Sequence, residues 1–225
     1  MPRRGEVISA TRLHFPDGTK TIPEITVKHL REYAISTFRL GISSAVAVNF
    51  LDAEVRTILL SAAPGLRVAV LHVPVWGAFV AALNTLLGEA QRQSAQYILY
   101  QSLEVTCSAP VLRLLLDHFT PDVLVVGPVL EGHTYTPGLQ ALNGRTTPWN
   151  TLALWSTRKL GLTGFLAVAD GIPQAKASTF NRQLTGDPNT FDFEREMSGD
   201  SGDESLFTPK AMVGTTSWWE GKDAK

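Results

Sequence analysis

The chain is poor in cysteine and in long apolar runs, and each scarcity excludes a class of protein. Among its 225 residues Cys107 is the single cysteine, so no internal disulfide can form and no oxidising compartment is required. No apolar stretch reaches the roughly 18–20 residues that a membrane helix needs. The basic start MPRRGEVISATRLHFPDG lacks the apolar run of a signal peptide. We therefore expect a cytoplasmic protein without a membrane span.

An excess of charge of either sign is also lacking. The formal net charge of −1 gives no long-range attraction to nucleic acid or to anionic lipid, so we expect no nucleic-acid partner. No G-x-G-x-x-G follows the first apolar strand, which disfavours a dinucleotide-binding protein of Rossmann type. Hydrophobic residues at 44% and charged residues at 18% are typical of a globular protein with room for a buried core.

Short apolar runs of strand length alternate with amphipathic helical patterns through the middle of the chain. An apolar helical stripe at i, i+3 and i+4 packs on a sheet, whereas an uninterrupted apolar run is typical of a strand buried between helices. Strands are expected at 44–51, 67–75, 97–100 and 122–130, with helices between them. This order predicts an α/β fold with a three-layer, doubly wound, mostly parallel sheet.

The two ends of the chain show weaker patterns. Residues 1–43 are expected to form an N-terminal arm, with a hairpin or irregular structure before a short helix, because Phe15-Pro16-Asp17-Gly18 is a turn sequence. Residues 44–170 would form the α/β domain, which includes a helix at about 152–162. Residues 171–225 are expected to be a mostly disordered tail, because they are acidic and contain few aliphatic side chains.

One stretch resembles a known family. A glycine, a helix that carries Ala-Leu-Asn, the strand Tyr97-Ile-Leu-Tyr100 and a polar cluster are similar to the core of nucleotide-diphospho-sugar glycosyltransferases of the A-type fold, especially the family-2-like inverting enzymes. The resemblance covers roughly residues 43–170. The family usually has Asp-x-Asp at the polar cluster, whereas this chain has Ser102-x-Glu104. The motif is therefore degenerate, with one carboxylate in place of two.

The resemblance implies a nucleotide site at the ends of the strands. Glu104, with His133 as a second candidate ligand, would hold a divalent metal, Mg²⁺ or Mn²⁺, and Ser102, Asn84 and Asn49 would contact the nucleotide. Each assignment has a structural alternative. Glu104 could cap the following helix, Asn84 could be a buried amide that satisfies a loop carbonyl, and His133 could be a surface histidine.

The polar loop after the last apolar strand would face the acceptor. Arg145, Trp149 and Asn150 form its densest polar and aromatic cluster, in which a tryptophan offers a flat face to a sugar ring. The alternative is a loop that is pinned by its own side chains. Asp170 follows Gly164-Phe165 near the position where the family has its catalytic carboxylate, but the acidic pair usual there is replaced by Ala-Asp-Gly-Ile-Pro.

Two functions follow from these residues. The first is the transfer of a sugar, with inversion, from a nucleotide sugar to an unknown acceptor. The second is a catalytically silent relative that binds a nucleotide sugar or a protein partner, which the serine in place of an aspartate and the lack of an acidic pair favour.

Overall fold

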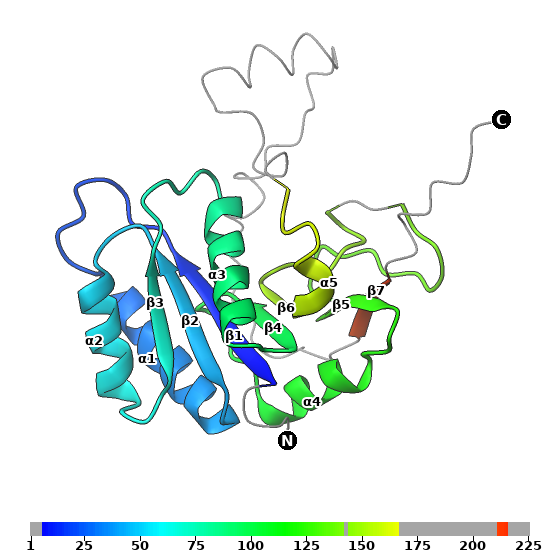
Figure 1. Ribbon diagram of the computed structural model, residues 1–225, viewed down its shortest axis with the longest axis horizontal. Coiled ribbons are helices and arrows are strands. Elements are labelled where there is room, and N and C mark those ends of the chain that lie inside the picture. The colour runs from blue at the N-terminus through cyan, green and yellow to red at the C-terminus, as the bar shows by residue number, and fades with distance from the viewer. Residues whose placement is uncertain (1–5, 142–143, 167–210, 216–225) are drawn as a thin grey trace, which may run out of the picture.

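A mixed sheet of parallel and antiparallel strands forms the centre of the protein. The computed structural model describes residues 6–141, 144–166 and 211–215. In this part of the chain the strand order is β3-β2-β1-β4-β6-β5-β7 (Figure 1). The strands β1 to β4 are mutually parallel, β6 is antiparallel to both β4 and β5, and β7 is antiparallel to β5. Their bounds are Val7–Leu13, Ser43–Val48, Val68–His72, Tyr97–Gln101, Val123–Pro128, Leu152–Ser156 and Ala211–Thr215, from β1 to β7.

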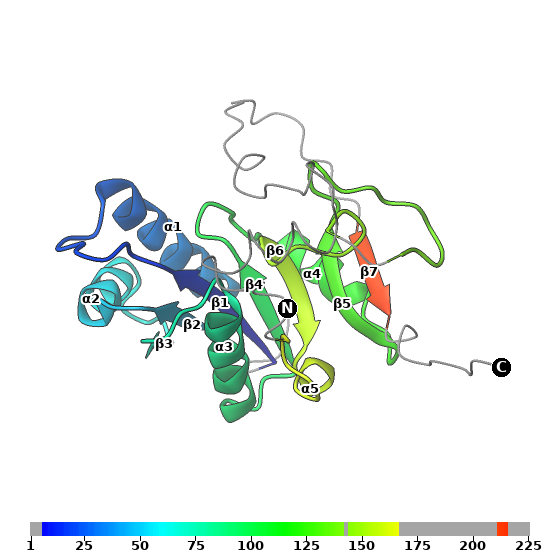
Figure 2. The ribbon, with the colours of Figure 1, turned by 90° about the horizontal axis from the view of Figure 1, so that it is seen from above.

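Helices cover both faces of this sheet, which confirms the expected three layers. The helices α1, α2 and α4 pack on one face, and α3 and the short α5 pack on the other (Figure 2). Their bounds are Glu24–Leu40, Asp52–Ala62, Val80–Arg92, Ala109–Asp117 and Thr157–Leu160, from α1 to α5. The mostly parallel α/β fold predicted from the sequence is therefore present.

The expectation of a hairpin or irregular arm at the start of the chain is wrong. Val7–Leu13 forms β1, which pairs with β2 on one side and with β4 on the other. The domain boundary expected after residue 43 is therefore not visible in the structure, because one continuous sheet contains strands from both sides of it. Polar residues inside this strand hid it, because Ser9 is fully buried and its hydroxyl donates a hydrogen bond to the Tyr33 hydroxyl of α1 at 3.0 Å.

The predicted helix at about 152–162 is also wrong over its first half. Leu152–Ser156 forms β6, and only Thr157–Leu160 is helical. A short apolar run is compatible with either structure in isolation. The neighbouring strands determine that this run is a strand, because β6 lies between β4 and β5 and pairs with both.

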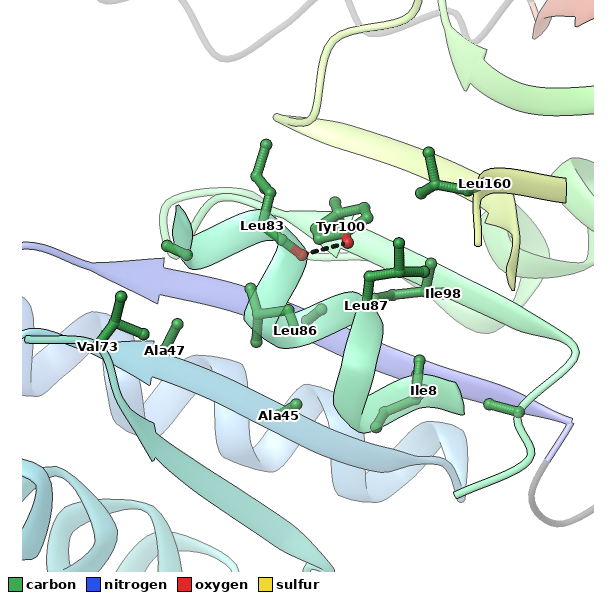
Figure 3. Close-up of a cluster of buried hydrophobic side chains, with 14 of the residues drawn as sticks. Ile8, Ala45, Ala47, Val73, Leu83, Leu86, Leu87, Ile98, Tyr100 and Leu160 are labelled. Carbon is green, nitrogen blue, oxygen red and sulfur yellow. Dashed lines mark hydrogen bonds between the residues drawn. The ribbon is translucent and has the colours of Figure 1, made fainter. Parts of the chain in front are cut away.

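The core between α3 and the sheet holds the strand ends in place. Leu83, Leu86 and Leu87 of α3 point onto the apolar side chains of β1, β2 and β4 (Figure 3). Tyr100 of β4 is buried among them, and its hydroxyl donates a hydrogen bond to the Leu83 carbonyl at 2.9 Å. Burial raises the pKa of the Tyr100 phenol, against a smaller opposing effect of the positive charge of Arg12, so the ring stays neutral.

Cys107 lies in the core under α4, and we expect its thiol to be unreactive in the folded protein. Burial raises its pKa to about 12, so almost no thiolate exists near neutral pH. A thiol reagent that turns yellow when it reacts, used at pH 8, should therefore detect no thiol in the native chain. It should detect one thiol after unfolding in guanidinium. Prompt labelling of the native protein would show that this core opens.

Two expectations concern other parts of the chain. The predicted disordered tail, residues 171–225, lies outside the described residues except for the strand β7. Within the described ranges, no helix combines the length and the apolar character that crossing a membrane requires.

Candidate functional site

A small polar cavity of about 120 Å³ lies where β1 and β4 end. Both strands are parallel and end at the same edge of the sheet, which is where open α/β sheets bind ligands. The volume is enough for a phosphate group but less than the roughly 300–1,000 Å³ of a typical small-molecule pocket, so a larger ligand would extend along the edge. The lining residues come from the two strand ends: Thr11, Arg12, Leu13, Gln101, Ser102, Leu103 and Glu104.

A larger hollow of about 350 Å³ lies elsewhere, on the outer face of α4. All of its lining residues belong to that helix, from Ala109 to Asp117, and no second element closes it. We therefore place the candidate site at the cavity between the ends of β1 and β4, which we name the β1–β4 site.

Arg12 brings a positive charge to the β1–β4 site. The last paired residues of the two strands are Ala10 and Tyr100, which face α3, and side chains alternate along a strand. Arg12 therefore continues on the α3 face, and its guanidinium carbon lies 5.9 Å from the centre of the Phe79 ring. Its side chain is exposed, so the charge is available to a ligand at this edge.

Two buried polar side chains of the site have no hydrogen-bond partner among the described residues. They are Thr11, through Oγ1, and Gln101, through Oε1, and each residue is only 3% exposed. A buried polar atom without a partner costs about 1–3 kcal/mol. Native proteins rarely retain such atoms unless water or a ligand satisfies them. A polar cavity beside both residues provides the space for that partner.

Ser102 and Glu104, which were selected from the sequence, both line this cavity, and their roles in nucleotide and metal binding stay predictions. The Ser102 N–H donates a hydrogen bond to the Thr151 carbonyl at 2.9 Å, which ties the end of β4 to the start of β6. Glu104 is exposed and lines the same cavity two residues later. The two residues are therefore adjacent to Arg12, which the sequence analysis did not select.

The residues present do not fit a metal site built on two carboxylates. Across the described ranges, no three side chains of His, Cys, Asp or Glu come together as metal ligands. Among the residues that line the cavity Glu104 is the single carboxylate, and the positively charged Arg12 lines the cavity as well. A bound divalent cation would be repelled by the Arg12 guanidinium.

The two asparagines selected from the sequence hold backbone segments. Phe15 N–H donates to Asn49 Oδ1 at 2.9 Å, and Asn49 Nδ2 donates to the Phe15 carbonyl at 2.8 Å. Asn84 makes the same reciprocal pair with Phe165, with both distances at 2.8 Å. The hydrogen bonds of the alternative left open for Asn84, an amide that satisfies a loop carbonyl, are thus observed, with the Asn84 side chain half-buried. A nucleotide contact by either asparagine stays a prediction.

Gly164 makes this contact of Asn84 possible. Its φ of +64° lies in the left-handed region, and a Cβ at this position would lie 2.9 Å from Asn84 Oδ1. Any larger residue would therefore push the amide away from Phe165.

His133 is held within its own loop. Its Nδ1 accepts a hydrogen bond from the Leu130 N–H at 2.8 Å, and its ring contacts the edge of Trp149 with the ring centres 4.3 Å apart. Burial lowers the pKa of His133, against a smaller opposing effect of the Thr147 backbone. The ring is therefore neutral at pH 7. A metal-binding role for His133 stays a prediction.

The proposed acceptor loop is pinned by its own side chains, which is the alternative that the sequence left open. Trp149 Nε1 donates to the Gly144 carbonyl, and the Trp149 ring packs over Gly132. Asn150 Oδ1 accepts a hydrogen bond from Trp155 Nε1 at 2.9 Å. The Arg145 carbonyl accepts one from the Thr134 N–H at 2.8 Å. Asp170, the predicted catalytic residue, lies outside the described residues.

This loop nevertheless reaches the same edge of the sheet as the β1–β4 site. It leaves the carboxyl end of β5 and enters β6 at Leu152, whose backbone is paired with Gln101. An acceptor role for Arg145, Trp149 and Asn150 remains a prediction that their position allows.

Sequence reasoning did not select Thr11 and Arg12, which lie at the end of β1. The signal was present, because Thr11-Arg12 follows four residues that are suited to a buried strand, and a polar pair at the end of a strand is typical of a ligand-binding edge. It was not used because the first strand itself was not predicted.

Comparison with solved structures finds the same fold. A mannosyltransferase from Pyrobaculum calidifontis, in complex with GDP-Man and Mn²⁺, matches with a TM-score of 0.52 and 12% identity over 71% of this chain. The match covers 46% of the mannosyltransferase, so this chain spans less than half of its length.

Two further solved structures also match, with lower scores. The 4-diphosphocytidyl-2C-methyl-D-erythritol synthase from Anaerococcus prevotii matches with a TM-score of 0.46 and 12% identity, over 78% of this chain and 84% of that one. A cytidylyltransferase from Leptospira borgpetersenii matches with a TM-score of 0.43 and 13% identity, over 78% of this chain and 71% of that one.

Searches with protein-family models and among curated proteins find no match. The fold thus rests on the strand order, on the helices of both faces and on the likeness to the mannosyltransferase. The chain has the A-type, glycosyltransferase-like fold of nucleotide-diphospho-sugar transferases.

Proposed function

We propose that the protein binds a nucleotide sugar at the β1–β4 site, with the diphosphate over the ends of the two strands. The observation that carries this proposal is the cavity itself, which lies at the ends of two parallel strands and combines an exposed cation, Arg12, with the polar lining residues Thr11, Gln101 and Ser102. A diphosphate needs a positive charge and hydrogen-bond donors. The Arg12 guanidinium provides the charge and several donors, and the Thr11 hydroxyl is a further donor.

The fold supports the choice of ligand class. In proteins of this fold the carboxyl ends of the parallel strands form the ligand-binding edge, and the mannosyltransferase that matches this chain is bound to GDP-Man. The small cavity would receive the diphosphate, while the base and the sugar would lie along the edge towards the loop of Trp149.

Transfer of the sugar to an acceptor is part of the proposal, at a reduced rate. The cavity contains a single carboxylate, Glu104, where the resembling family has two. A catalytically silent relative that binds a nucleotide sugar would differ from this proposal in rate alone, and one that binds a protein partner would not bind the nucleotide, so binding is the property to test first.

Calorimetric titration with UDP, GDP, CDP and ADP tests the binding. We expect at least one of them to bind with a dissociation constant between about 1 µM and 1 mM, the range in which enzymes commonly bind their substrates. Ser102→Phe should abolish this binding, because the ring would fill a cavity of about 120 Å³.

Thr106→Phe is the matched control. Thr106 is exposed, lies four residues further along the same loop and does not line the cavity, so its binding should equal that of the unmodified chain. If no nucleotide binds, or if Ser102→Phe binds as well as Thr106→Phe, the site is wrong.

A further inference from the structure

We propose that Arg12 takes the place of the divalent metal ion in this site, so that the diphosphate binds without a metal. The inference rests on the proposed function, because it specifies how the same site binds its ligand. It is carried by the position of Arg12, by the charges around it and by the groups beside it.

The first step is the position of Arg12 relative to Ser102. Each residue lies two positions beyond the last β1–β4 pair, Ala10 and Tyr100, and side chains of that parity face α3. Arg12 and Ser102 therefore follow neighbouring strands on the same face, and both line the cavity. Ser102 occupies the position at which the resembling family has its first metal-binding carboxylate. The guanidinium thus lies beside the place where the metal would be expected.

The second step is the balance of charge. With aspartate at position 102 the cavity would contain two carboxylates, and a cation would be needed before a diphosphate could approach. Serine removes one negative charge, and Arg12 offsets the charge of Glu104. The described residues give Arg12 no ion-pair partner, so its charge is not already neutralised by a salt bridge.

The third step is geometry. A guanidinium offers several N–H donors in a plane and binds two phosphate oxygens at once, which a lysine cannot reproduce. The Phe79 ring beneath it, at 5.9 Å, restricts where the guanidinium can lie. Thr11 and Gln101 also line the cavity, where a threonine hydroxyl can donate to a phosphate oxygen and a glutamine oxygen can accept from a bound water.

The test is a calorimetric titration with UDP, GDP and inorganic pyrophosphate, in EDTA and again with Mn²⁺. We expect the affinity in EDTA to equal that in Mn²⁺. Arg12→Gln should weaken it by about 10- to 100-fold, the range for losing hydrogen bonds to a charged group, and Arg12→Lys should restore only part of the loss. Arg113→Gln, an exposed arginine on α4, should bind as the unmodified chain does.

A second variant tests the same balance of charge in the opposite direction. Ser102→Asp restores the second carboxylate, so it should bind the nucleotide poorly in EDTA and regain affinity when Mn²⁺ is added. Thermal unfolding, followed by circular dichroism, verifies that each variant is folded.

The possible outcomes separate this inference from the proposed function. Binding that requires Mn²⁺, or that is unchanged in Arg12→Gln, overturns the role of Arg12 and leaves the nucleotide site standing. Binding of pyrophosphate but of no nucleotide supports Arg12 as a diphosphate-binding residue and overturns the proposed nucleotide ligand. Absence of binding by pyrophosphate and by all four nucleoside diphosphates, UDP, GDP, CDP and ADP, overturns both.

Discussion

Sugar transfer by this protein is expected to be at least about 100-fold slower than the roughly 10 per second of a median enzyme. Loss of a single electrostatic group that stabilises the transition state reduces the rate of other enzymes by about 10²–10³-fold. The β1–β4 site has one carboxylate where the resembling family has two, and its cation is an arginine with less charge than a divalent metal. The measurement is release of the nucleoside diphosphate from UDP- and GDP-sugars, with simple sugars as acceptors.

An ordinary turnover number would contradict this expectation and would end the silent-relative interpretation. A general base would then have to be found, because transfer with inversion requires the acceptor hydroxyl to lose its proton as the new bond forms. Asp170 is the first residue to test, through Asp170→Asn, with Asp122→Asn as a control outside the site.

The second large effect concerns the core beneath the site. Leu86→Ala should reduce the free energy of unfolding by about 2–5 kcal/mol, because the substitution leaves a cavity that rigid neighbours cannot fill. Leu86 is completely buried between α3 and the strands β1, β2 and β4 (Figure 3). Guanidinium unfolding, followed by circular dichroism, measures the change.

Leu162→Ala is the matched control for this prediction. Leu162 is 80% exposed, so its truncation should change the stability by no more than about 0.5 kcal/mol. Equal losses in the two variants would mean that the packing of α3 on the sheet is not what stabilises the strand ends.

The sequence was sufficient for elements with a strong local pattern. The helix α3 and the strand β4 follow from an apolar stripe and from an apolar run, and the structure has both near the expected residues. β1 and β6 could not be predicted in this way, because their structure depends on neighbours. β1 contains the polar residue Ser9, whose hydroxyl is buried but forms a hydrogen bond with Tyr33 of α1. β6 is a strand because it pairs with β4 on one side and with β5 on the other.

The site could be predicted only in part for the same reason. Ser102 and Glu104 were found because they follow a recognisable strand and occupy the positions of a family motif. Arg12 belongs to a strand whose partner, β4, is distant in the sequence, so their proximity is visible only in the sheet. Asn49 and Asn84 show the reverse. A polar residue near the end of an apolar strand and one within an apolar helix were interpreted as nucleotide contacts, and the structure shows that both form hydrogen bonds to the chain itself.

A crystal of this protein soaked with UDP or GDP in the presence of EDTA tests the central claim most directly. The account predicts electron density for a diphosphate between the ends of β1 and β4, with its oxygens on the Arg12 guanidinium and beside Ser102. A diphosphate bound elsewhere, or one that appears at this edge only after Mn²⁺ is added, would contradict it.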